Sequence, residues 1–241
     1  DVASLVRLCS GLGVTAVHAV QPAAGPGLGH VLMGALCLAG LELVRLGMTP
    51  LRVDQAAQRL GFRAGPFLMM DMEGLPVLAV RLRRVAEWLG CRPPGANDPL
   101  ADRLAKGAVG RAVGRGFYDH PSEGPRPPKS MAGTRRDPAD VLGNMPPRHA
   151  LHAALVGAAM QLLSRGAVLR ASDLDVLMVR GYGYERARGG PLFAADQRGM
   201  LEILQDFKAL SKMGSPLWQV PPMLLDMVKN GEGFFGRRID T

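Results

Sequence analysis

A histidine at the start of a long apolar segment, His30, has a side chain whose type suits proton transfer. An imidazole works as a general base when a nearby carboxylate orients it and stabilises its charged form. Neither Asp nor Glu lies within one helical turn of His30. A structural histidine that is hydrogen-bonded at a helix start is therefore the simpler interpretation, and the sequence predicts no catalytic residue.

Three cysteines, Cys9, Cys37 and Cys91, are the candidates for metal or redox chemistry. They are odd in number, lie far apart and include no Cys-x-x-Cys pair, and the five histidines lack the spacing of a zinc site. The sequence thus predicts no metal site and no disulfide framework. Free thiols are typical of a reducing compartment, and we expect a cytoplasmic protein.

Two segments have the glycine or arginine content of phosphate-binding loops. Residues 25–29 hold three glycines, but no βαβ unit precedes them, so a junction between domains is the favoured interpretation. Arg186 and Arg188 stand beside Gly189-Gly190 and could contact a phosphate. A structural loop with solvated arginines is favoured over that role, and no cofactor-binding residue is predicted.

Composition predicts a mainly helical fold. Hydrophobic residues make up 47% of the 241 residues and aromatic residues only 5%, so the core must be mostly aliphatic. Ala, Leu and Met favour helix.

The net charge of +8 is scattered along the sequence, without a block of five like charges. We therefore predict no nucleic-acid partner, while binding of a phosphate-bearing ligand stays open. The longest apolar run, 31–41, is too short for a bilayer, and we predict no membrane association.

The elements that would position these side chains follow from hydrophobic periodicity, caps and breakers. One strand is predicted over the β-branched run 14–20. Helices are predicted over 1–13, 30–46, 50–60 with Thr49 as N-cap, 67–73, 75–89, 99–106, 151–163, a segment capped by Ser172 that ends at Arg180, 191–210 and 221–230.

A proline-rich segment, 120–146, separates the two helical regions. It holds many polar residues and cannot bury enough apolar area to pack, so an exposed linker is predicted. The chain starts at Asp1 without a basic segment typical of a signal peptide, and we expect its start to be a cut within a longer polypeptide.

An ordered series of landmarks occurs twice along the chain. The first series is Gly47, Asp54, Gly65-Pro66-Phe67, Asp71 and Gly74. The second series is Gly166, Asp175, Gly190-Pro191-Leu192, Asp196 and Gly199. Proline and the later aspartate are five residues apart in both copies. The series predicts a duplicated helical unit in which Asp71 and Asp196 hydrogen-bond backbone amides at a helix or loop junction.

The residues around these landmarks resemble the C-terminal helical domain of 3-hydroxyacyl-CoA dehydrogenases, and two copies resemble the multifunctional enzymes of fatty-acid β-oxidation. The segments that carry the resemblance are Leu46-Gly47-Met48-Thr49-Pro50, Gly61-Phe62-Arg63-Ala64-Gly65-Pro66-Phe67, Asp71-Met72-Glu73-Gly74-Leu75, the glycine-rich stretch 107–119, Gly181-Tyr182-Gly183-Tyr184 and Arg188-Gly189-Gly190-Pro191.

The resemblance implies two tandem, duplicated helical domains related by pseudo-twofold symmetry, over 29–119 and 147–241. Residues 1–28 resemble the tail of the family's Rossmann domain, the nucleotide-binding part that binds NAD and carries the catalytic His–Glu pair. The rest of that domain has no match in this sequence. We therefore expect NAD to be bound by a domain upstream or in another subunit, and none by this chain alone.

The resemblance also places His30 where the family has an asparagine that faces the substrate, which adds a substrate-binding interpretation for this residue. Other polar positions of the family fall on Val31, Ala39 and, in the second copy, Gly157-Ala158.

The first functional hypothesis is the substrate-side and dimer-mimicking part of an NAD-dependent 3-hydroxyacyl-CoA dehydrogenase, with acyl-CoA as substrate and no competence alone. The alternative is a non-catalytic module that binds acyl-CoA or another subunit.

Overall fold

The chain folds into helices connected by short loops in the computed structural model, which describes all residues except 18, 21–24, 97, 127–141 and 238–241. The prediction of a mainly helical fold is confirmed. Most of the predicted linker, 127–141, lies outside the described residues, as does the basic pair Arg135-Arg136.

The first half holds α1 (Val2–Gly11), α2 (Leu28–Arg45), α3 (Pro50–Leu60), α4 (Pro66–Glu73), α5 (Leu75–Leu89), α6 (Pro99–Ala105) and the 3₁₀ turn η1 (Arg111–Val113). The second half holds α8 (Pro147–Ser164), α9 (Ala171–Gly181), η3 (Arg186–Arg188), α10 (Pro191–Arg198), α11 (Met200–Ser211), η4 (Pro216–Trp218), α12 (Pro222–Asn230) and a hairpin of β1 (Glu232–Gly233) and β2 (Gly236–Arg237).

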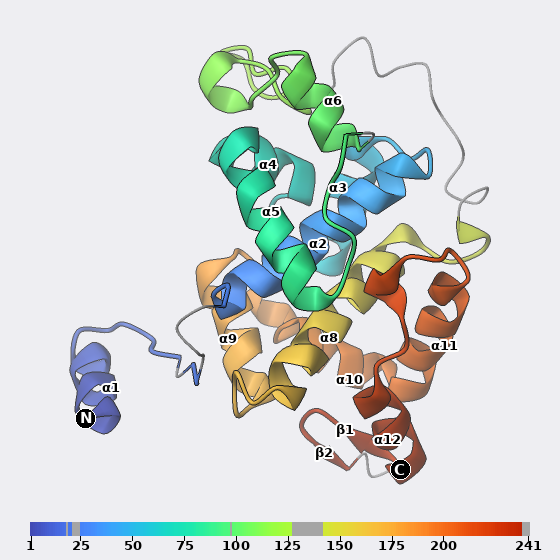
Figure 1. The fold of residues 1–241 in the computed structure, drawn as a ribbon. Helices are drawn as coiled ribbons and strands as arrows, with labels where there is room; N and C mark the ends of the chain where they lie inside the picture. Colours follow the sequence, from blue (N-terminus) through green and yellow to red (C-terminus); the bar gives the residue numbers. More distant parts are fainter. Residues whose placement is uncertain (18, 21–24, 97, 127–141, 238–241) are drawn as a thin grey trace.

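The core is centred on two helices, α2 and α8, that pack against each other in the middle of the fold (Figure 1). Each is 18 residues long, and 14 residues of α2 and 12 of α8 are buried. By length and composition alone α2 could cross a membrane. Its apolar surface is instead covered by α5 and α8, as a helix that is hydrophobic on all sides requires.

Reciprocal contacts join the two halves around this pair. Helix α3 packs on α8, and α9 packs on α2. The loops that follow α3 and α9 also meet, because the Arg63 amide donates to the Gly183 carbonyl and the Glu185 amide donates to the Gly61 carbonyl, at 3.1 and 2.7 Å. The loop after α3 is therefore positioned by the loop after α9.

The N-terminal segment differs from the sequence-based expectation. Helix α1 stands apart from the other helices, and none of its residues is buried (Figure 1). The strand predicted over 14–20 is wrong for the described residues 14–17 and 19–20, which form no strand. A strand needs a neighbour to satisfy its ladder of amides and carbonyls. Here the Val20 amide donates instead to the Ala167 carbonyl, in a loop.

Two predicted helix boundaries are also wrong. Helix α9 begins at Ala171, so Ser172 lies inside its first turn, and Arg170 bonds Asp173 across the helix start at 3.0 Å. The single helix predicted over 191–210 is two helices, because Gly199, with φ of 89°, turns the chain between α10 and α11.

A buried carboxylate closes the start of α4. The first amides of a helix have no intrahelical partner, and the residue before α4 is Gly65, which has no side chain to accept from them. Asp54, on α3, accepts from the amides of Phe67 and Leu68 at 2.9 and 3.0 Å. This bond fixes the angle between α3 and α4, and it requires a glycine, since a Cβ at Gly65 would lie 2.3 Å from Asp54.

A second carboxylate, Asp71, holds the glycine-rich stretch that follows α6. It accepts from the amides of Phe117 and Tyr118, both at 2.8 Å, and bonds His120 Nε2 at 2.9 Å. The predicted role of Asp71 is thereby confirmed.

The second half repeats both contacts with different residues. Asp175 accepts from the amides of Leu192 and Phe193 at the start of α10, both at 2.8 Å. Asp196 accepts from the amides of Phe234 and Phe235 in the hairpin, at 2.8 and 3.0 Å, as expected for this residue. Burial raises the pKa of both Asp54 and Asp175 to about 6, although the hydrogen bonds to each carboxylate act in the opposite direction.

An ion pair joins α4 to α5 in the first half, and another joins α10 to α11 in the second half, with the acidic and basic positions exchanged. Glu73, at the end of α4, pairs with Arg81 on α5. Arg198, at the end of α10, pairs with Asp206 on α11 at 2.7 Å and also contacts the ring of His149 at 3.2 Å. Burial raises the pKa of Asp206, but the hydrogen bonds from His149 and Arg198 outweigh it and leave that pKa below its ordinary value.

We predict that Gly65→Ala lowers the free energy of unfolding by about 1–3 kcal/mol, because the new methyl group overlaps the backbone of Asp54. The matched control is Gly181→Ala at the end of α9, where the nearest atom to a new Cβ is 3.8 Å away. That change should leave stability unchanged or raise it by up to about 1 kcal/mol. Urea denaturation measures both, and equal effects would contradict the close approach of Asp54.

We predict a pH-dependent loss of stability in Asp206→Asn. A lowered carboxylate pKa adds stability above the ordinary pKa and loses it as pH falls through the folded-state value. The variant should therefore be less stable than the parent by about 1–3 kcal/mol at pH 7, with a difference that shrinks below about pH 4. Asp226→Asn, an exposed position on α12, is the control. A difference that stays constant from pH 7 to pH 3 would refute the ion pair's contribution.

Candidate functional site

His30, the predicted substrate-binding residue, lies in the first turn of α2 with an exposed side chain. The preceding Gly29 is buried beneath the ring of Tyr182, whose hydroxyl would lie 2.1 Å from a Cβ at this glycine. Among the described residues no side chain hydrogen-bonds the His30 ring, so neither a structural bond nor a carboxylate partner holds it. His30 thus presents its imidazole outward from an open helix start.

The start of α8 has the same pattern but is closed by polar side chains. His149 is the third residue of α8, as His30 is the third residue of α2. Its Nδ1 lies 3.2 Å from the guanidinium of Arg198 and 3.4 Å from the carboxylate of Asp206. The two halves therefore place a histidine at the same helical position in different electrostatic surroundings.

The histidine one turn further along α8, His152, is structural. Its Nε2 lies 2.8 Å from the Pro191 carbonyl, which can only accept, so Nε2 carries the proton. Nδ1 then accepts from Arg198 at 3.4 Å. Burial lowers the pKa of His152 to about 4, which keeps the ring neutral. A neutral ring held on both sides and shielded from solvent does not act as a general base.

The buried polar side chains of the first half, Asp54, Asp71, Tyr118 and His120, are also hydrogen-bonded within the fold. The Tyr118 hydroxyl donates to Asp54 at 2.9 Å, in addition to the two amides that this carboxylate already accepts. Asp71 and His120 bond each other with almost no exposed side-chain surface. These groups fix the glycine-rich stretch against α3 and α4, and their polar atoms are used in hydrogen bonds within the fold.

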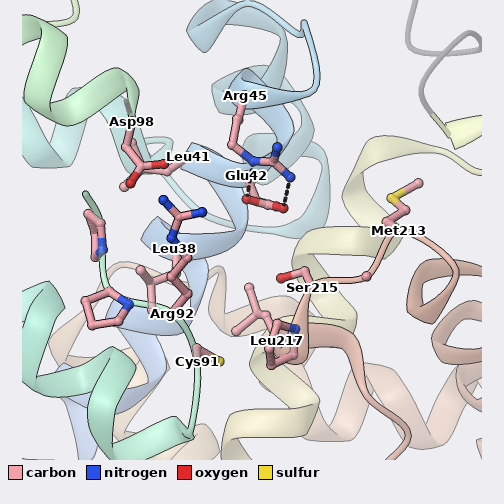
Figure 2. A pocket seen from close by; sticks show the side chains of 14 residues that line it. Leu38, Leu41, Glu42, Arg45, Cys91, Arg92, Asp98, Met213, Ser215 and Leu217 are labelled. Carbon is pink, nitrogen blue, oxygen red and sulfur yellow. Dashed lines mark hydrogen bonds and ion pairs between the residues drawn. The ribbon is translucent and has the colours of Figure 1, made fainter. Parts of the chain in front are cut away.

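A cavity of about 190 Å³ lies between the C-terminal half of α2, residues 91–94 with Asp98, and the loop at 213–217 (Figure 2). Its charged side chains balance, because Arg45 pairs with Glu42 at 2.5 Å, and Arg92 and Asp98 add one charge of each sign. Ligand pockets usually measure about 300–1,000 Å³. The size and the balanced charge of this cavity do not suit a large anionic substrate.

The thiols lack the features of nucleophiles. Burial raises the pKa of Cys37 to about 12 and that of Cys91 to about 11, so both stay protonated near neutral pH. Within the described part of the chain, no three His, Cys, Asp or Glu side chains come together as a metal site would require.

The sequence interpretation of the arginine loop holds for Arg188, which bonds Glu185 at 2.6 Å and the Arg59 carbonyl at 3.1 Å. It missed the group formed by His149, Arg198 and Asp206. A usable signal was present, since His149 follows His30 by the same 119 residues that separate the first residues of α8 and α2.

Curated relatives of the chain are multifunctional enzymes. The peroxisomal bifunctional enzyme of Cavia porcellus is 28% identical over 184 residues, which are 68% of this chain and 25% of that protein. The fatty acid oxidation complex subunit alpha of Pseudomonas entomophila is 26% identical over 208 residues, 80% of this chain and 28% of that protein. The chain thus spans little more than a quarter of the length of these relatives.

The predicted cytoplasmic location is wrong by these comparisons. Peroxisomal enzymes lead the set of relatives, including a peroxisomal fatty acid beta-oxidation multifunctional protein of Oryza sativa, 29% identical over 170 residues. Free cysteines indicated only a reducing compartment, which does not distinguish the cytosol from other compartments without disulfides.

The fold has solved counterparts. A 3-hydroxybutyryl-CoA dehydrogenase from Escherichia coli matches with a TM-score of 0.68 and 17% identity, over 95% of this chain and 65% of that one. The dehydrogenase part of a multifunctional enzyme from C. elegans matches with a TM-score of 0.52 and 15% identity, over 76% of this chain and 42% of that one. At these identities the likeness concerns the fold.

The family comparison agrees with the segments that carried the sequence resemblance. Residues 30–120 match the family model described as 3-hydroxyacyl-CoA dehydrogenase, C-terminal domain. The match runs from His30 at the start of α2 to His120, which bonds Asp71. Residues 30–120 of the chain therefore match the C-terminal domain of the 3-hydroxyacyl-CoA dehydrogenase family.

Proposed function

We propose that this chain is the helical, substrate-side portion of an NAD-dependent 3-hydroxyacyl-CoA dehydrogenase of fatty-acid β-oxidation, and that it is not competent alone. The observation that carries the proposal is the family match over α2 to the glycine-rich stretch. In this assignment the open start of α2, with His30, faces the acyl-CoA substrate. Domains at 29–119 and 147–241, joined by a linker at 120–146, form its two parts.

The second domain is proposed as a copy of the first. Its support is the recurrence of contacts rather than of letters: Asp54 and Asp175 close the starts of α4 and α10, and Asp71 and Asp196 hold the closing segments. The packing of α2 on α8, with α3 and α9 crossing to the opposite half, supports the proposed pseudo-twofold relation. Such a copy would replace the partner subunit of a single-copy enzyme.

The described residues do not fit NAD. A dinucleotide site needs a glycine-rich turn between a strand and a helix, with the pyrophosphate at the helix start. The strands within the described residues are the two short ones of the hairpin, and neither leads into a helix. The cofactor, which accepts the hydride, therefore belongs to a domain upstream in the same polypeptide or in another subunit.

Helix α1 supports this division. Its apolar side chains Val2, Leu5 and Leu8 are exposed, which is unusual for an amphipathic helix unless another domain covers it. We propose that residues 1–28 are the tail of the nucleotide-binding domain and that α1 packs on the rest of it.

A second candidate, a non-catalytic module that binds acyl-CoA or another subunit, has its own observation. Ala39 and Ala158, at positions where the resemblance implies polar residues, are buried in the core. The reading frame that precedes Asp1 separates the two. A Gly-x-Gly-x-x-Gly after a strand there supports the enzyme, and a different domain supports the module.

We predict that the chain alone binds no NADH in isothermal titration calorimetry and binds acetoacetyl-CoA weakly. His30→Ala should weaken acetoacetyl-CoA binding by about 2- to 10-fold, the usual range for one hydrogen bond. Glu87→Ala, exposed on α5, is the control and should bind like the parent. NADH binding by the parent chain would contradict the assignment of the cofactor to another domain, and equal affinities of His30→Ala and parent would remove the role of His30.

We predict that deletion of residues 1–13 leaves the melting temperature of the chain within about 1 °C, because surface changes without buried contacts cost little stability. Differential scanning calorimetry measures it. A fall of several degrees would show that α1 packs on this chain and not on another domain.

A further inference from the structure

A cavity of about 430 Å³ lies where the end of α3 and the turn η3 meet the starts of α8 and α10. Four arginines line it, Arg59, Arg148, Arg188 and Arg198, and we call it the arginine cavity. Other lining side chains include His149, His152 and Tyr184, and among the described residues that line it none is acidic. The charged residues that line the arginine cavity are therefore all basic, whereas those of the cavity in Figure 2 are balanced in sign.

Two of the four guanidinium groups are not neutralised. Arg188 pairs with Glu185 at 2.6 Å, and Arg198 pairs with Asp206 at 2.7 Å. Arg59 and Arg148 have exposed side chains and no carboxylate partner within the part of the chain that the structure describes. Among the described residues, two of the arginines that line the cavity therefore have no carboxylate partner.

The side chain of Tyr184 lines the same cavity and carries a buried hydroxyl without a partner. Tyr184 is 2% exposed, and its hydroxyl has no hydrogen bond in the described structure. Its ring is fixed edge-on against Phe62, at 5.1 Å between centroids, and beside Gly61, where a Cβ would lie 3.0 Å from the ring. An unpaired buried hydroxyl costs free energy, so an acceptor from outside the chain, a ligand oxygen or a water, would stabilise it. Burial raises the pKa of Tyr184 to about 12, so the group is a neutral donor.

The open space continues beyond this cavity. An adjoining cavity of about 310 Å³ shares Arg59 and Arg148 and is also lined by Arg52 and Gln55 of α3. Within the described residues it too has no acidic lining. A ligand whose anionic group lies in the arginine cavity would therefore have space for the rest of its structure along α3.

We propose that the arginine cavity binds the phosphomonoester group of a small molecule. Such a group carries a charge of about −1.5 to −2 near neutral pH, which matches two free guanidinium groups. The planar fork of arginine binds phosphate through paired hydrogen bonds. Arg59 and Arg148 supply the charge, and the Tyr184 hydroxyl supplies a directed donor. The site lies at the start of α8, apart from the start of α2, so it does not rest on the proposed dehydrogenase role.

The test is calorimetric titration of the full chain with inorganic phosphate and with AMP, at constant ionic strength set by chloride. Tyr184→Phe should weaken binding about 3- to 10-fold while leaving the melting temperature equal or higher, because the lost hydroxyl has no partner in the fold. Arg148→Gln should weaken binding about 10-fold or more. The control is Arg83→Gln, exposed on α5 outside both cavities, which should bind like the parent.

The affinities of the two cavity variants and of the control decide whether the site exists. Binding of AMP or of phosphate that falls in both cavity variants and not in the control supports the site. Tighter binding of AMP identifies an organic phosphomonoester as the ligand, and equal binding identifies the phosphate group alone. Equal losses in Arg148→Gln and Arg83→Gln, or parent-like affinity in Tyr184→Phe, would overturn the proposal in favour of diffuse attraction to a basic protein.

Discussion

Each half of this protein depends on a carboxylate that is buried in a space kept open by a glycine. Asp54 reaches across to the start of α4, where Gly65 leaves the first amides without a capping side chain. Without the carboxylate those amides would be buried and unpaired, and the negative charge would lose the favourable end of the helix dipole. Asp71 continues from the same helix to the closing segment. Three elements are thereby held at fixed angles by two side chains, so α2 receives a preformed surface to pack on.

The two halves share this scaffold and differ in the charges built on it. The pair Glu73–Arg81 and the pair Arg198–Asp206 join corresponding helices with the signs exchanged. In the second half the exchange places a guanidinium toward the start of α8, where it contacts His149. His30, at the start of α2, has no such neighbour among the described residues. One scaffold therefore presents an open helix start in one half and a basic, partly closed one in the other.

The fold could be predicted from the sequence where a residue type has few structural uses. A glycine followed by proline marks a helix start, and an aspartate at a fixed spacing from it marks the carboxylate that binds backbone amides. The break at Gly199 was also available, because Gly74 separates α4 and α5 at the same place in the first half. The strand over 14–20 could not be judged from local preference, since β-branched residues form a strand only where a partner strand exists. Contacts between halves, such as Tyr184 with Phe62, carry no local signal at all.

The contact between α2 and α8 contains small apolar residues at positions where the family resemblance implies polar ones. Ala39 and Ala158 are fully buried, and a polar side chain at either position would need a partner that an aliphatic surface does not provide. Small apolar residues satisfy the packing of the two helices without serving catalysis. The starts of the helices are less constrained, because the exposed side chains of His30 and Arg148 can change without disturbing the buried contact between α2 and α8. The two sites that we propose, His30 and the arginine cavity, therefore lie at the helix starts, where the two halves diverge, and the core fixes how those starts are placed.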